Sequence, residues 1–282
     1  LKKVVFVCGA GHSGSTLLGL ILGSHSDCFY AGEAKNSCFI GKENRPIQKR
    51  TCKVCGFDCP VWGNLTLEDS KILYEKLSFK TQKPIIIDST KDVAWIAEKI
   101  ANMKNSETQI FLLFIQRDGR AVINSWIRKN PEKDVREQIQ KWIQNMRDAN
   151  KIFNSFASHK LKIRYEELAT NPQQEMMKIC NFLNIEYEPK MLKFYESEHH
   201  PIGGNNGTQS LLIKVQKRKI NDLSVLRQSR IKLDNYPQME YYKKHELGIS
   251  LDLRWREELA PSVERLFEEM AGKENAEMKW DA

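Results

Sequence analysis

The sequence has no long hydrophobic run, and none of its apolar stretches approaches the roughly 20 residues that a membrane-spanning helix requires. It also has no internal repeat and no low-complexity tract. No signal-peptide pattern is visible, because the first apolar run, which starts at Val4, is too short for a secretory core segment. With 41% hydrophobic and 28% charged residues in 282 positions, the composition is typical of a soluble globular protein. We therefore predict a single domain over residues 1–282 without a membrane partner.

Acidic residues are the minority among the charged ones, with 36 against 44 basic residues and a formal net charge of +8. This balance favours an anionic ligand without choosing between a nucleotide, a nucleic acid and a membrane surface. The excess is concentrated between Lys214 and Lys232, where Asp222 is the one opposing charge. The chain has no basic motif with interleaved aromatic residues, so a nucleic-acid-binding protein is the weaker interpretation and no nucleic-acid partner is expected.

The sequence also lacks the even number of cysteines that a disulfide framework would need. The seven cysteines are an odd number, which favours reduced thiols in a cytoplasm over a disulfide framework. Three of them, Cys52, Cys55 and Cys59, lie within eight positions, and Cys38 upstream is a candidate fourth ligand of a structural zinc ion. A firm zinc pattern needs a second well-spaced pair, so reduced thiols or a disulfide remain the alternatives.

Short β-branched or apolar runs alternate with longer helical patterns along the chain. This alternation predicts the α/β class, in a three-layer P-loop-like fold whose central parallel sheet is flanked by helices. The predicted strands are 4–8, 84–88, 109–116 and 161–165. The predicted helices are 15–23, 92–103, 120–129, 132–156, 173–183 and 254–270.

Two stretches break this alternation. Residues 35–66 hold four cysteines and few periodic apolar positions, and we interpret them as an insertion or lid. Residues 198–246 are polar and basic, with Gly and Asn concentrated at 203–207. For this second stretch we predict a long mobile loop region that can close over a ligand.

A strand, a glycine loop and an apolar helix follow one another at the start of the chain. Glycines let the backbone turn so that successive N–H groups converge on one anion, and the helix N-terminus adds partial positive charge. The spacing of Gly9 and Gly14 matches a Walker A loop, but Ser15 stands at the position of its lysine. A P-loop kinase, with Asp88 as its magnesium carboxylate, is therefore the weaker alternative, because the charge aimed at the transferring phosphate is missing. We expect a less highly charged donor group, for which His12 supplies the basic side chain.

This loop resembles the 5′-phosphosulfate loop of the sulfotransferases that use 3′-phosphoadenosine-5′-phosphosulfate (PAPS). The family loop reads Pro-Lys/Arg-Ser-Gly-Thr/Ser-Thr, and this chain departs from it by a glycine for the proline and a histidine for the basic residue. The resemblance extends over about residues 3–190 and is greatest to the bacterial and tyrosylprotein-type branch. It implies that PAPS is held by Gly11, His12, Ser13, Gly14, Ser15 and Thr16.

The second part of the resemblance is the 3′-phosphate site. In the family, a strand ends in an arginine and a serine follows eight residues later on the next helix; Arg117 and Ser125 have this spacing. An arginine fork and a nearby hydroxyl can bind one phosphate together. The resemblance also implies a basic tail segment over this phosphate, for which Lys214, Arg218 and Lys219 are the candidates.

The third part concerns catalysis. In the tyrosylprotein-type branch a Gly-Glu pair supplies the base, so the resemblance implies that Glu33 is the base, with His199 or His200 as the fallback. Lys91 follows a strand where this branch places a lysine that contacts the sulfate. The expected reaction is in-line sulfuryl transfer, in which Glu33 takes the acceptor's proton while His12 and Lys91 stabilise the leaving phosphate. This scheme needs no metal. We expect an apolar wall to raise the pKa of Glu33 toward neutrality.

The acceptor does not follow from these motifs. Polysaccharide and protein acceptors usually imply secretory targeting, which the sequence does not show. We therefore expect a hydroxyl or amino group on a small molecule, with natural product biosynthesis as one setting, and a cytoplasmic location.

Overall fold

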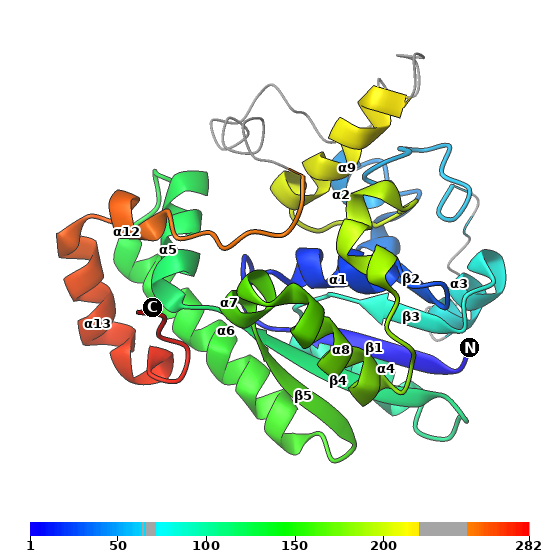
Figure 1. Ribbon diagram of the computed structural model, residues 1–282, viewed down its shortest axis with the longest axis horizontal. Helices are drawn as coiled ribbons and strands as arrows, with labels where there is room; N and C mark the ends of the chain where they lie inside the picture. The colour runs from blue at the N-terminus through cyan, green and yellow to red at the C-terminus, as the bar shows by residue number, and fades with distance from the viewer. Residues whose placement is uncertain (64, 66–71, 220–246, 282) are drawn as a thin grey trace.

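Five parallel strands form one sheet at the centre of the computed structural model, which describes residues 1–63, 65, 72–219 and 247–281 (Figure 1). Their order across the sheet is β2-β3-β1-β4-β5. The strands are β1 (Lys3–Cys8), β2 (Cys28–Gly32), β3 (Ile85–Asp88), β4 (Gln109–Gln116) and β5 (His159–Arg164). The chain starts in the middle of the sheet, builds one side and then crosses to the other. Ligands of such sheets bind beyond the carboxyl ends of the strands at this change of direction, between β1 and β4.

The core lies around the two central strands. Val4 pairs in register with Ile86 of β3 and with Ile110 of β4, and residues 4–7 and 112–115 are fully buried. Both strands are almost continuously apolar because helices cover both faces of the sheet. The α/β prediction is confirmed.

Helices connect the strands and surround the sheet (Figure 1). Among the described residues, no helix has both the length and the apolar composition needed to cross a membrane. The longer helices are α1 (Ser15–Gly23), α3 (Leu73–Thr81), α4 (Val93–Asn102), α5 (Gly119–Lys129), α6 (Val135–Ser155), α8 (Pro172–Leu183), α9 (Asn206–Lys219) and α13 (Pro261–Asn275). The short ones are η1 (Ala34–Phe39), α2 (Ile47–Arg50), α7 (Tyr165–Thr170), η3 (Pro189–Glu196) and α12 (Trp255–Glu258).

Two predicted elements differ from the structure, and two observed elements were not predicted. The helix predicted over 254–270 is two helices, because Ala260 is extended (φ −60°, ψ 139°) and α13 begins at Pro261. A proline disfavours the helical conformation of the residue before it but suits the first helical turn. The loop predicted over 198–246 contains helix α9, and its residues 220–246 lie outside the described residues. Strand β2 and helix α3 were not predicted from their short patterns.

Candidate active site

The glycine loop between β1 and α1 has the backbone that its glycines predict. Gly9 has φ 137°, and a Cβ there would lie 2.4 Å from the carbonyl oxygen of Ile115. Gly14 has φ 94°, and a Cβ there would lie 2.7 Å from the ring of Tyr165. His12 is also left-handed, with φ 72°, although it is not glycine. A side chain held in this sparsely populated conformation is common at ligand-binding sites.

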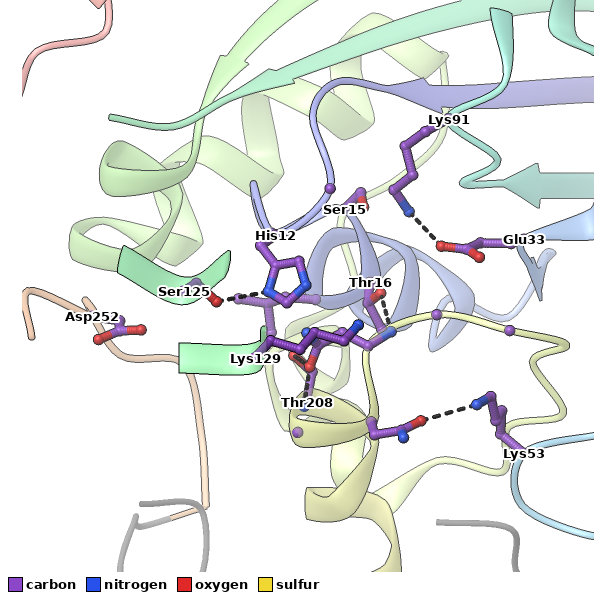
Figure 2. Close-up of a pocket in the computed structure, with 18 of the residues that line it drawn as sticks. His12, Ser15, Thr16, Glu33, Lys53, Lys91, Ser125, Lys129, Thr208 and Asp252 are labelled. Atoms are coloured by element: carbon purple, nitrogen blue, oxygen red, sulfur yellow. Dashed lines mark hydrogen bonds and ion pairs between the residues drawn. The ribbon is translucent and has the colours of Figure 1, made fainter. Parts of the chain in front are cut away.

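A cavity of about 710 Å³ lies against this loop, at the carboxyl ends of four strands. The glycine loop follows β1, Glu33 follows β2, Lys91 comes shortly after β3, and Arg117 follows β4; residues from all four places line the cavity. Figure 2 shows His12 of the loop, Glu33 and Lys91 around the cavity. Its lining is strongly basic. Among the described residues that line it, two are carboxylates, Glu33 and Asp252, and seven are cations, which are Lys49, Lys53, Lys91, Arg117, Arg128, Lys129 and Arg254. Such a cavity suits a ligand with several negative charges.

His12 bridges the glycine loop and helix α5. Its Nδ1 lies 2.7 Å from the Ser125 hydroxyl (Figure 2). Burial lowers the pKa of His12 to about 3, and the nearby charges of Lys129 and Arg117 lower it in the same direction. A pKa this low favours the neutral imidazole, so His12 faces the cavity as a hydrogen-bonding group rather than as a cation.

Arg117 is buried and joins the glycine loop to the segment that contains Asp252. Its guanidinium donates hydrogen bonds to the carbonyl oxygens of His12 (3.1 Å) and Asp252 (3.0 Å), and it lies 3.3 Å from the Asp252 carboxylate. It also lies over the Tyr165 ring, 4.3 Å from its centroid. Its Nε is buried without a hydrogen-bond partner among the described residues. Arg117 thus fixes the His12 backbone and keeps one donor unused.

Glu33 and Lys91 form an ion pair on one side of the cavity, with 3.0 Å between the carboxylate Oε1 and Nζ (Figure 2). Lys91 also donates to the carbonyl oxygen of Ser89, at 2.8 Å. Burial raises the pKa of Glu33, but the charge and hydrogen bond of Lys91 outweigh burial, so the pKa lies below its ordinary value. The predicted rise in this pKa is wrong, because the nearest group to the carboxylate is a cation and not an apolar wall.

The other predicted donor-binding residues are placed in different ways. Gly11, Gly14, Ser15 and Thr16 line the cavity. The Ser13 side chain is buried, and its hydroxyl has no hydrogen-bond partner among the described residues. Helix α9 includes Lys214, Arg218 and Lys219, but the structure does not describe their side chains.

The fallback bases are not at the cavity. His199 is buried against the carbonyl oxygen of Phe194, at 2.9 Å, and burial lowers its pKa to about 4. His200 lies among cysteines, 3.1 Å from the Cys55 sulfur. Neither residue lines the cavity, so Glu33 is the better-placed candidate of the three.

In the kinase alternative, Asp88 would bind magnesium, but its carboxylate is already used in buried hydrogen bonds. Asp88 is fully buried and accepts hydrogen bonds from the Tyr74 hydroxyl (2.7 Å), the Trp95 indole (3.0 Å) and the backbone N–H of Thr90 (2.8 Å). It does not line the cavity. These bonds give Asp88 a structural role and weaken the kinase interpretation.

Several cavity residues were missed by the sequence analysis. Lys53 reaches the cavity from the cysteine segment, by which we mean residues 52–59, and its Nζ donates to the Asn206 side chain at 2.9 Å (Figure 2). Lys129 ends helix α5, one turn after Ser125, and this spacing was a usable signal. Asp252 lies far along the chain, and no pattern in the sequence connected it with Arg117.

Comparisons with known proteins agree on one family. A sequence model described as "Sulfotransferase family" matches residues 110–189, which include Arg117 and Ser125. A putative protein-tyrosine sulfotransferase of Caenorhabditis briggsae is 27% identical over 213 residues, or 69% of this chain and 70% of that protein. In Caenorhabditis elegans, protein-tyrosine sulfotransferase A is 32% identical over 111 residues, or 36% of this chain and 27% of that protein.

Two solved structures share the fold. A sulfotransferase domain from the curacin biosynthetic pathway has a TM-score of 0.55 at 20% identity, covering 97% of both chains. A sulfotransferase domain from the Synechococcus PCC 7002 olefin synthase has a TM-score of 0.51 at 16% identity, covering 94% of both chains. At these identities the likeness establishes the arrangement of helices and strands.

Proposed function

The chain belongs to the sulfotransferase superfamily of enzymes, and on that premise we propose that residues 1–282 form one domain that transfers the sulfuryl group of PAPS to an acceptor held beside Glu33. The observation that carries this proposal is the basic cavity at the carboxyl ends of the strands, where a phosphate loop without a Walker lysine meets Arg117, Ser125 and the Glu33–Lys91 pair. A kinase would require a lysine and a free magnesium carboxylate at the same place.

The residues present suit the two anionic ends of the donor. The N–H groups of the glycine loop and the N-terminus of α1 suit the 5′-phosphosulfate. Arg117, with its unused Nε, and Ser125 suit the 3′-phosphate. The buried, unpartnered Ser13 hydroxyl is a further donor within the loop. Lys214, Arg218 and Lys219 remain proposed contacts of the 3′-phosphate.

The chemistry asks little covalent work of the protein. A bond forms between the acceptor oxygen or nitrogen and sulfur, the bond from sulfur to the bridging oxygen breaks, and the acceptor's proton passes to the Glu33 carboxylate. The pKa of Glu33 lies below its ordinary value because Lys91 offsets the effect of burial, so the carboxylate is ionised at neutral pH and can accept that proton. Lys91 is placed to stabilise the charge that develops as the phosphate leaves. His12 contributes a neutral hydrogen-bond donor unless the bound anion raises its pKa.

We propose a hydroxyl or amino group on a small molecule as the acceptor, and the cytoplasm as the location, which suits seven free thiols. A tyrosyl hydroxyl within a protein is the second candidate, because a relative that covers 69% of this chain is a putative protein-tyrosine sulfotransferase. Both acceptors require the same base at Glu33.

The test is calorimetric titration with 3′-phosphoadenosine-5′-phosphate, the desulfated donor, against ATP with magnesium. We expect binding of the bisphosphate without metal and much weaker binding of magnesium ATP. The reverse order would overturn the proposal. Incubation with PAPS and matched phenol, amine and tyrosyl-peptide acceptors, followed by mass spectrometry for sulfated product, then separates the acceptor candidates.

A further inference from the structure

Three cysteines and one histidine converge beside the cavity but outside it. The ligand atoms of Cys52, Cys55, Cys59 and His200 all lie within 4.8 Å of one another. The His200 Nδ1 is 3.1 Å from the Cys55 sulfur and 3.6 Å from the Cys59 sulfur. In a tetrahedral zinc site with Zn–S bonds of about 2.3 Å, neighbouring ligand atoms are about 3.8 Å apart. These four groups need to move only slightly to reach that geometry.

The backbone around the cysteines has the form of a metal-binding turn. Gly56, directly after Cys55, has φ 75°, and its N–H donates to the carbonyl oxygen of Cys52 at 3.1 Å. The N–H of Cys55 points at the Cys52 sulfur, 3.5 Å away, as a donor to a thiolate does. Cys52 and Cys59 are buried, with 0% and 2% exposure. All seven cysteines fall within the described residues and are free thiols, so no disulfide competes for these sulfurs in the structure.

His200 is oriented as a zinc ligand usually is. Its Nδ1 faces the sulfurs, while its Nε2 lies 2.9 Å from the Glu198 carboxylate. A carboxylate on the far nitrogen of a histidine fixes the ring and its tautomer in many metal sites. The carbonyl oxygen of His200 accepts a hydrogen bond from the Trp62 indole, at 2.6 Å, which fixes the backbone as well. His200 therefore takes the place that the sequence suggested for Cys38, which is not part of the cluster.

The cluster joins two segments that form one wall of the cavity. Ile202 pairs with both Gly32 and Cys52, and the N–H of Lys53 donates to the carbonyl oxygen of Pro201 at 2.9 Å. The N–H of Glu33 donates to the carbonyl oxygen of Ile202 at 2.7 Å. A metal held by residues 52–59 and by His200 would lock the backbone that carries Lys53 and Glu33.

We propose that Cys52, Cys55, Cys59 and His200 bind one structural zinc ion, which fastens the cysteine segment to residues 198–206 and so holds Lys53 in the cavity wall. All four tetrahedral positions are protein ligands, which is typical of structural rather than catalytic zinc. The site has no place for a substrate.

The test is the zinc content of the untagged protein, expressed with zinc and passed through a metal-free column, measured by inductively coupled plasma mass spectrometry. We expect about one zinc per chain, as for a closed four-ligand site. The Cys59→Ser and His200→Ala variants should lose most of it, whereas the matched Cys38→Ser control should keep it. Cobalt substitution should give thiolate-to-metal charge-transfer absorption in the wild type and in the Cys38→Ser variant.

A second measurement covers variants that fail to fold. Titration of the wild-type protein with an organomercurial thiol reagent, in the presence of a chromogenic zinc chelator, should release the zinc in step with the modification of three thiols. Zinc far below one per chain in the wild type, or equal loss in Cys38→Ser and Cys59→Ser, would overturn the proposal. Metal content is read without donor or acceptor, so this result is independent of the proposed sulfuryl transfer.

Discussion

Replacing Glu33 with glutamine tests the proposed base with little change of shape. Glutamine keeps a side-chain oxygen that can accept the hydrogen bond from Lys91, but it loses the charge and the ability to take a proton. The ion pair that is lost is partly exposed, with side-chain exposures of 33% for Glu33 and 22% for Lys91. Pairs of this kind contribute about 0–1 kcal/mol, so the melting temperature should change by no more than about 4 °C.

The effect on catalysis should be much larger than this. General-base catalysis contributes about 10²–10⁴-fold, which corresponds to about 3–5 kcal/mol of the activation barrier. We therefore expect Glu33→Gln to lower turnover at least 100-fold while the dissociation constant of 3′-phosphoadenosine-5′-phosphate changes by less than about threefold. The exposed Glu107→Gln variant is the matched control and should retain full turnover.

Turnover would be followed as bisphosphate release from PAPS, with the best acceptor of the phenol, amine and peptide series, and bisphosphate binding by calorimetry. A variant that keeps turnover within tenfold of the wild type would refute Glu33 as the base. A variant that loses bisphosphate binding together with turnover would instead show that Glu33 shapes the donor site. Because the pKa of Glu33 lies below its ordinary value, the wild-type rate should not decline on the acid side through this group until the pH falls below about 4.5.

Three other predictions concern binding and stability. Ser125→Ala removes the hydroxyl beside His12, and we expect about tenfold weaker bisphosphate binding by calorimetry, with the exposed Ser158→Ala variant unchanged. Arg117→Lys keeps the charge but loses the fork that holds His12 and Asp252, so both melting temperature and bisphosphate affinity should fall; an unchanged affinity would remove Arg117 from the donor site. His199 has its folded-state pKa lowered by burial to about 4, so its contribution is complete above the unfolded value of about 6.5 and declines as the pH falls below it. Urea denaturation should therefore show a loss of about 2 kcal/mol from this group between pH 7 and pH 5, which His199→Gln should abolish; equal pH dependence in both proteins would contradict it.

The elements that follow local rules were predictable from the sequence. Helix α1 begins at Ser15 and ends at Gly23 as predicted, because a strand, a glycine loop and an apolar run leave few alternatives. Arg117 and Ser125 meet at the cavity because strand ends and the first turns of the following helices share one edge of a parallel sheet. The order of strands, loops and helices along the chain therefore predicts where such residues lie, without any knowledge of distant contacts.

Features that depend on distant neighbours were not predictable. The pKa of Glu33 is lowered by Lys91, which lies 58 positions away. The low pKa of His12 depends on burial and on two distant cations, Lys129 at the end of α5 and Arg117 directly after β4. His200 joins cysteines that lie about 140 positions earlier, so the spacing rule searched for the fourth ligand in the wrong part of the chain. Neither the composition nor the spacing of residues in the sequence indicates which distant side chains will be in contact.

Because His12 has a pKa of about 3, its charge can change when an anionic ligand binds in the cavity. Neighbouring cations are part of the reason that its pKa is about 3, and a bound bisphosphate would offset their repulsion. A rise in the His12 pKa on binding means that the protein takes up a proton with its ligand. Wyman linkage then requires the bisphosphate to bind more tightly as the pH falls, and the heat of binding to vary with the ionisation enthalpy of the buffer.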